Sequence, residues 1–235
     1  MSAAKILAEL KSLGQPSYKK TMMSHGIREP AYGVKIEDMK KIVKRVGKNY
    51  ELALELYESG VSDAMYLAGL MADETKMTKK DLERWVDAAY CGMLYSYTVP
   101  WVAAESPHGW ELGLQWIDSK QESVAAAGWA TLGSLAGYLP DSELDLDQYK
   151  QLLVRAAKSI HEQPNGVRYA MNGFVISVGG GIKSLTKLAL KTGASIGKVS
   201  VDMGDTACKT PSIVEYIGKI EARGSLGKKR KTTRC

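Results

Sequence analysis

Residues 124–132 read VAAAGWATL, a largely apolar run with small side chains at its centre. Two further stretches have the same character: DAMYLAGLM at 63–71 and RYAMNGFVI at 168–176. A run that is apolar on most faces predicts a helix buried on most sides. Small residues in its middle permit a neighbouring backbone to approach closely. The sequence therefore predicts three similar core helices, spread over much of the chain.

Amphipathic segments lie between these core helices. The stretch VKIEDMKKIVKRVG (34–47) carries Ile, Met and Val at helical spacing and stops at a glycine. Thr78, followed three residues later by Asp81, has nearly the pattern of a capping box at the start of another such helix. Core helices that alternate with amphipathic helices predict helix pairs stacked in layers, an α-solenoid.

The spacing of the core helices points to a repeat. Gly128 and Gly173 are 45 residues apart, close to the period of HEAT-like repeats. We therefore expect an all-α superhelix of HEAT-like helix pairs, more than half helical, in a single domain over residues 1–222. The alternative is an irregular helical bundle with alanine-rich core helices.

One segment near the C-terminal end reads differently: KVSVDMGDTACKT, residues 198–210. Apolar and polar side chains alternate up to Met203, and the pair Gly204-Asp205 suits a two-residue type II′ turn. The pattern predicts one small β-hairpin in an otherwise helical protein. An isolated two-stranded hairpin is marginal in water. We therefore expect it either to pack against the last helices as a connector or to be held by a partner.

The net charge of +6 belongs to the end of the chain. Residues 222–235 hold six Lys and Arg and no acid, so the first 221 residues are formally neutral. A basic segment of this kind is usually solvated and often helps to bind nucleic acid or acidic surfaces. We expect residues 223–235 to form a flexible basic tail.

Composition narrows the protein class. The three cysteines, Cys91, Cys208 and Cys235, are scattered and odd in number, which argues against a disulfide framework. No apolar run reaches membrane-spanning length, and the N-terminus lacks a signal-peptide pattern. The three histidines have no metal-ligand spacing. We expect a cytoplasmic monomer, associated with the nucleoid in a bacterium, with no metal, cofactor or membrane partner.

Three segments carry a family resemblance: PAYGVKIEDMKKIVKRV (30–46), SYTVPWVAAE (96–105) and GVRYAMNGFVISVGG (166–180). They resemble segments of the DNA alkylation repair proteins of the AlkD type, a superfamily of HEAT-like repeat DNA glycosylases. The resemblance spans roughly residues 30–190. It implies a superhelix whose concave face cradles duplex DNA.

The resemblance also implies where catalytic residues would lie, and this chain departs from the pattern. Ser96 stands four residues before Pro100, where the family's alkylpurine glycosylases carry an Asp. Gly92 and Gly173 stand at or near the positions of two Trp, and Ala125 at or near that of an Arg.

Base excision needs a carboxylate that stabilises cationic sugar character as the base leaves. Ser96 supplies no charge, so whether the chain is an enzyme is left open, and excision is expected to be weak or absent. Glu105 and Glu122 are the candidate replacement acids. Four tryptophans lie at spacings that suit either core packing or stacking on bases in a groove: Trp101, Trp110, Trp116 and Trp129.

A basic surface is the stronger signal. Three lysines recur every fourth residue from 183 to 191, and no acid occurs between Gly179 and Ser200. The stripe leads into the predicted hairpin, which adds two lysines. The candidate DNA-contacting residues are Arg168, Lys183, Lys187, Lys191, Lys198, Lys209, Lys228, Lys229, Arg230 and Lys231.

These observations favour a DNA-binding protein that recognises the backbone and the shape of damaged, distorted or branched duplexes rather than their sequence. Two alternatives stay open. One is an active glycosylase for 3-methyladenine or 7-methylguanine with a displaced carboxylate, and the other is a HEAT-like protein-interaction scaffold.

Overall fold

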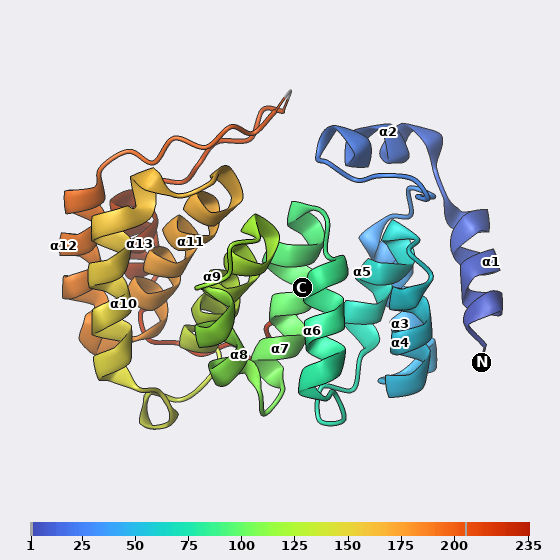
Figure 1. Ribbon diagram of the computed structural model, residues 1–235, viewed down its shortest axis with the longest axis horizontal. Helices are drawn as coiled ribbons and strands as arrows, with labels where there is room; N and C mark the ends of the chain where they lie inside the picture. Colours follow the sequence, from blue (N-terminus) through green and yellow to red (C-terminus); the bar gives the residue numbers. More distant parts are fainter. Residues whose placement is uncertain (1, 205) are drawn as a thin grey trace.

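The computed structural model describes residues 2–204 and 206–235. Helices joined by short connections make up most of the chain (Figure 1). The α-helices are α1 (Ala3–Leu13), α2 (Pro16–Ser24), α3 (Ile36–Val46), α4 (Tyr50–Glu58), α5 (Ser62–Met71), α6 (Lys79–Ala88), α7 (Val99–Glu105), α8 (Gly109–Trp116), α9 (Glu122–Ala136), α10 (Leu146–Ser159), α11 (Asn165–Gly181), α12 (Thr186–Ile196) and α13 (Ile213–Ala222). A π-helical turn, η1 (Leu94–Thr98), precedes α7, and short 3-10 turns are η2 (Asp141–Glu143), η3 (Ile160–Glu162) and η4 (Lys183–Leu185).

The three similar segments are core helices, as predicted, and together they form what we call the inner row. They lie in α5, α9 and α11, and η1 with α7 completes the row between α5 and α9. Every residue of α5 is buried. The remaining helices are amphipathic and cover this row, and the capping box predicted at Thr78 and Asp81 is present at the start of α6. The all-α, more than half helical fold is therefore confirmed.

Glycines of the inner row differ in what faces them. A Cβ built on Gly69 would lie 2.4 Å from the Thr98 side chain, and one built on Gly128 would lie 2.6 Å from the Ile117 backbone nitrogen. At these two positions the small residue lets the next helix come close. A Cβ at Gly173 would meet nothing within 4 Å. Gly173 therefore opens a space instead of closing a contact.

Asp63 anchors the first of the resembling segments to the inner row. Its side chain is fully buried in α5 and accepts backbone N–H bonds from Tyr32 at 2.6 Å and Val34 at 2.7 Å. These bonds compensate the carboxylate for its loss of water. The segment before α3 is thus fixed against the start of α5.

The predicted β-hairpin is wrong in its secondary structure. Residues 198–204 and 206–211 belong to an extended arm that leaves the end of α12 and returns to α13, but no β-strand occurs within residues 2–204 and 206–235 (Figure 1). Gly204 nevertheless has the positive φ, 60°, that the predicted turn requires. Asp205, the other turn residue, lies outside the described residues.

Side chains take the place of strand pairing in holding the arm. Asn165, at the start of α11, donates from Nδ2 to the Asp202 carbonyl at 2.7 Å and accepts from the Asp202 N–H at 2.8 Å. Val199 is buried, whereas Lys198 and Lys209 are exposed. Because two extended segments without a third strand are marginal as a sheet, this anchor and the packing of Val199 keep the arm in place.

Residues 225–235 do not extend away from the protein, as a flexible tail would. We call them the strap, because they run from α13 along the ends of the inner helices to the middle of the molecule, where Figure 1 marks the C-terminus. Lys229 Nζ donates to the carbonyls of Gly181 at 2.7 Å and Ala136 at 2.8 Å, the last residues of α11 and α9. Farther along, Thr233 donates to the Trp101 carbonyl in α7 at 3.0 Å.

The last two residues of the strap reach α5. Arg234 donates to the Ala72 carbonyl, directly after α5, at 2.9 Å and pairs with Glu74 at 2.8 Å. Cys235 Sγ lies 3.0 Å from the Tyr66 hydroxyl. The C-terminal end of a helix carries unpaired carbonyls and partial negative charge. Lys229 and Arg234 therefore neutralise the C-terminal ends of α5, α9 and α11.

The strap also joins the two halves of the core. Buried side chains form one cluster from α1 to α9 and another from α7 to α13. Lys229 binds the second cluster's helices, and Arg234 and Cys235 bind a helix of the first.

Within the described residues, no single helix is long and apolar enough to cross a membrane, although α11 and α12 pass that test when joined across their 112° bend.

Candidate nucleic-acid interface

A cleft of about 690 Å³ separates α2 from the arm. In Figure 1 these two elements approach each other along one edge of the molecule. The floor of the cleft is made by η1 and the first turns of α11, which bring Ser96, Tyr97 and Tyr169 to its surface. Tyr18 and Met22 line it from α2, and the arm lines it from the other side.

Proline explains why Ser96 lies here. Pro100 has no N–H, so the carbonyl of Ser96, four residues earlier, has no helical donor. The chain forms a π-helical turn instead, in which the Val99 N–H donates to the Leu94 carbonyl. A π-helical turn widens the helix locally and is common at functional sites.

A smaller pocket opens from the same surface. It has a volume of about 220 Å³ and shares Ser96, Tyr97 and Tyr169 with the cleft. We call it the Gly173 pocket, because the space in front of that glycine forms part of it. Its remaining lining includes Trp101, Ser134, Asn172, Ser177 and Arg230.

Trp101 lines the Gly173 pocket although only 7% of it is exposed, and its ring centroid lies 6.0 Å from that of Tyr97, one helical turn earlier. Trp116 and Trp129 are buried in the core, and the half-buried Trp110 packs on Tyr149. Burial, and secondarily the neighbouring Tyr97, raises the pKa of Tyr169 well above its usual value. The tyrosine therefore stays neutral in any physiological buffer.

The two candidate acids have different surroundings. Glu105 is buried, with 5% of its side chain exposed, and it accepts bonds from the strap, including the Thr233 N–H at 2.5 Å. Glu122 is exposed at the start of α9, and its Oε1 accepts the Gly166 N–H at 2.5 Å. Glu122 lies next to Tyr95 at the cleft, where burial first and the Glu122 charge second raise the tyrosine pKa. Glu105 is therefore bound by the strap and does not line the cleft, whereas Glu122 lies beside the cleft.

Sequence reasoning missed the carboxylate nearest to the cleft. Asp202, on the arm, is the only carboxylate among the described lining residues, and its Oδ1 accepts the Gly204 N–H at 2.9 Å. No signal in the sequence predicted that the arm, and Asp202 with it, would line the same cleft as η1. Within the described ranges no cluster of His, Cys, Asp or Glu suits a metal ion.

The candidate basic residues separate into two groups. Lys183, in η4, and Lys187 and Lys191, in α12, are exposed at one end of the molecule and do not line the cleft. Lys198 and Lys209 are exposed on the arm, beside a hollow of about 820 Å³ between the arm, α12 and α13. We call these five residues the lysine row, and none of them forms an ion pair with a described residue.

The other candidates are less free. Arg168, half-buried in α11, donates to Asn165 Oδ1 at 3.4 Å and thus touches the residue that holds the arm. In the strap, Lys229 is committed to helix carbonyls and to Asp141 at 2.8 Å. Arg230 is exposed at the Gly173 pocket, and Lys228 and Lys231 are exposed beside it in sequence.

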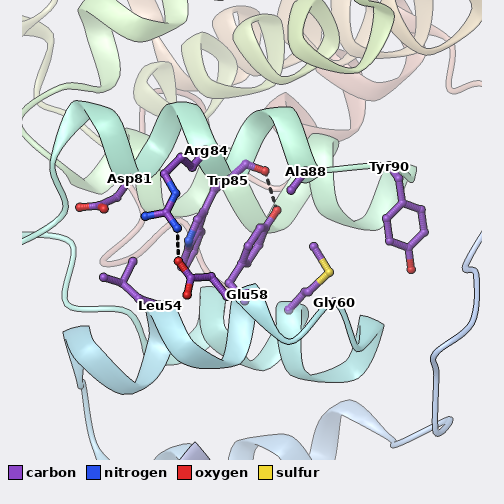
Figure 2. Close-up of a pocket in the computed structure, with 10 residues that line it drawn as sticks. Leu54, Glu58, Gly60, Asp81, Arg84, Trp85, Ala88 and Tyr90 are labelled. Carbon is purple, nitrogen blue, oxygen red and sulfur yellow. Dashed lines mark hydrogen bonds and ion pairs between the residues drawn. The ribbon is translucent and has the colours of Figure 1, made fainter.

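A fourth cavity lies elsewhere, between α4 and α6, with a volume of about 290 Å³ (Figure 2). The rings of Tyr57 and Trp85 stack there with centroids 4.1 Å apart, and Arg84 and Glu58 form an ion pair across it. Because its opposite charges pair with each other and its rings pack together, we assign it no function.

Comparison with known proteins identifies the family of this chain. The family model described as DNA alkylation repair enzyme matches residues 6–198. This chain belongs to that family. It is 33% identical over 220 residues to the uncharacterized protein Lin0241 of Listeria innocua, covering 92% of this chain and 95% of the relative. The uncharacterized protein Lmo0209 of Listeria monocytogenes is 32% identical over the same shares.

A solved structure supports the same fold in more detail. It is that of a new family of proteins related to the HEAT-like repeat DNA glycosylases with affinity for branched DNA structures. The two chains cover each other fully, with a TM-score of 0.92 and 35% sequence identity. The resemblance inferred from the three sequence segments and the HEAT-like superhelix are therefore confirmed.

Proposed function

We propose that this protein binds DNA and recognises branched or distorted duplexes through their backbone and shape, with weak or absent base excision. The observation that carries the proposal is the combination of the cleft with the lysine row. Lysines without acidic partners attract phosphates, while the tyrosines and methionines of the cleft suit sugars and unstacked bases. The affinity of the solved relative for branched DNA structures supports the same reading.

The chemistry of the cleft argues against efficient excision. Ser96 occupies the position where the resembling glycosylases carry an acid, and the described residues of the cleft offer one carboxylate, Asp202, whose Oδ1 is bonded to Gly204. A carboxylate engaged in fixing an exposed arm is poorly placed to stabilise a cationic sugar. The alternative, a glycosylase with a displaced acid, is favoured by one observation, the position of Glu122 beside Tyr95.

Binding is tested by titrating linear, mismatched and four-way-junction DNA with the full chain at about 50 and 200 mM salt. We expect the tightest binding to the junction, and binding to every DNA that weakens as salt rises. Equal affinity for all three DNAs would show that the protein does not recognise DNA shape. No binding to any DNA at the lower salt would favour the scaffold alternative.

Excision is tested in parallel by measuring free base released from methylated duplex. We expect no robust release of 3-methyladenine or 7-methylguanine by the unmodified protein. Ser96→Asp should not create strong release either, because Gly92 and Gly173 stand at or near the two positions where the resembling glycosylases carry Trp. If the unmodified protein releases these bases and Glu122→Gln stops it, the displaced-acid alternative is correct.

A further inference from the structure

The Gly173 pocket exists because a side chain is missing from the inner row. Gly69 and Gly128, in the other two similar helices, are covered by neighbouring atoms, whereas a Cβ at Gly173 would meet nothing within 4 Å. The walls around this space are flat rings, those of Tyr97, Trp101 and Tyr169. Such walls suit a planar aromatic ligand.

Asn172 is among the lining residues, but its free acceptor does not face the pocket. Its Nδ2 donates to the Pro211 carbonyl at 3.0 Å. Its Oδ1 has no hydrogen-bond partner among the described residues, yet that atom is itself buried, so the hydroxyls and the rings supply the polar contacts for a ligand.

The charges of the pocket restrict the ligand further. None of its described lining residues carries a carboxylate, and its hydroxyls come from three serines and two tyrosines: Ser96, Ser134, Ser177, Tyr97 and Tyr169. Arg230, at the rim, is cationic. An alkylated base with a positive charge finds no compensating anion here. A neutral heteroaromatic ring with both donors and acceptors matches the walls and the polar groups together.

We infer that the Gly173 pocket binds one neutral, unpaired nucleobase. This inference rests on the proposed DNA-binding function and gives it a mechanism. Proteins recognise splayed bases by stacking them on aromatic side chains and by hydrogen bonds to their edges. Branch points and bulges present unstacked bases, whereas a fully paired linear duplex keeps its bases stacked. The pocket thereby distinguishes the two kinds of DNA.

The test compares a duplex that contains a single bulged 2-aminopurine with a fully paired duplex that contains the same base. Both are titrated with the full chain, and the fluorescence of the base and the affinity are recorded together. We expect the bulged base to be quenched on binding, because it stacks on the rings of the pocket, and the paired base to change little.

A substitution at a second open helix glycine supplies the matched control. Gly173→Phe fills the pocket, and we expect it to weaken binding to the bulged duplex about tenfold, the effect of losing one base–aromatic stack. Its affinity for the paired duplex should stay the same. Gly218→Phe, in α13, adds the same ring at a glycine where a Cβ also meets nothing within 4 Å, so it should leave both affinities within about twofold.

The outcomes separate this inference from the proposed function. If the unmodified protein binds DNA but quenches both bases equally, or if Gly173→Phe keeps the full preference for the bulge, the pocket does not bind a base. If the unmodified protein binds neither duplex nor the four-way junction, the proposed function itself fails. Should Gly173→Phe fail to fold, which its thermal unfolding reveals, the quenching by the unmodified protein decides alone.

Discussion

The strap and the arm both carry basic side chains and both lie near the C-terminal end of the chain, yet these side chains have opposite surroundings. Arg234, in the strap, has 7% of its side chain exposed and binds carbonyls and carboxylates. Lys198 and Lys209, on the arm, are exposed and unpaired among the described residues. The comparison teaches that the net charge of a segment does not identify a DNA-binding surface. Its geometry decides whether the charge serves the fold or a partner.

The largest effect that tests this comparison is expected in the strap. Arg234→Ala removes a buried cation that binds Glu74, Glu105 and the end of α5. Removing one partner of such a buried pair costs about 3–5 kcal/mol of unfolding free energy, measured by denaturant titration. Lys231→Ala, at an exposed strap residue, is the matched control and should change stability by less than about 0.5 kcal/mol. Equal losses in the two variants would show that the strap is not specifically bound.

The arm should behave in the opposite way. Lys198→Ala combined with Lys209→Ala should leave stability nearly unchanged and weaken binding to every DNA. The slope of log affinity against log salt should fall by about two units if each lysine contacts one phosphate. Lys158→Ala, an exposed lysine on α10, is the control. An unchanged slope in the double variant, with a reduced slope in Lys231→Ala, would reverse the roles of arm and strap.

A smaller effect is expected where the arm is anchored. Asn165→Ala removes two hydrogen bonds to the Asp202 backbone, at a cost of about 1–2 kcal/mol of stability. Because the arm then loses its position over the cleft, the preference for junction over linear DNA should decrease, while linear affinity stays similar. Preserved preference in a folded variant would mean that the arm does not take part in shape recognition.

The smallest expected effect is on the pH dependence of stability. Burial by itself raises the pKa of Glu74, but the bond from Lys48 and the charge of Arg234 outweigh it and hold that pKa below its ordinary 4.5. A carboxylate with a lowered folded pKa stabilises the protein above its unfolded pKa, and this contribution is lost as pH falls through the folded pKa. The stability difference between the unmodified protein and Arg234→Ala should therefore shrink below about pH 4.5. A difference that stays constant down to pH 3 would contradict the role given to Glu74.

Much of the fold could be predicted from the sequence because it is encoded locally. Apolar runs with central glycines predicted α5, α9 and α11, and the Thr78 and Asp81 spacing predicted a cap. The proline at position 100 marked the segment that reaches the cleft, although the π-helical turn before it was not foreseen.

The errors arose where long-range contacts decide the structure. Alternation at 198–210 predicted strands, but pairing needs stability that two extended segments lack, and Asn165 holds the arm instead. Lys229 and Arg234 were predicted to be solvated in a flexible tail, and this was wrong because both bind carbonyls at helix ends. Such carbonyl partners have no sequence signature. The Gly173 pocket could not be predicted either. Gly173 resembles Gly69 and Gly128 in its sequence surroundings, and only the folded neighbours show that those two are covered while Gly173 is open.

The strap has a consequence for the rates of folding and unfolding. Its contacts join residues 48 apart at Gly181, 132 apart at Trp101 and 169 apart at Tyr66. Contacts that close such long loops carry a large entropic cost and form late. Interactions that are absent from the folding transition state slow unfolding and have little effect on the folding rate. The strap therefore prolongs the lifetime of the closed superhelix without hastening its formation.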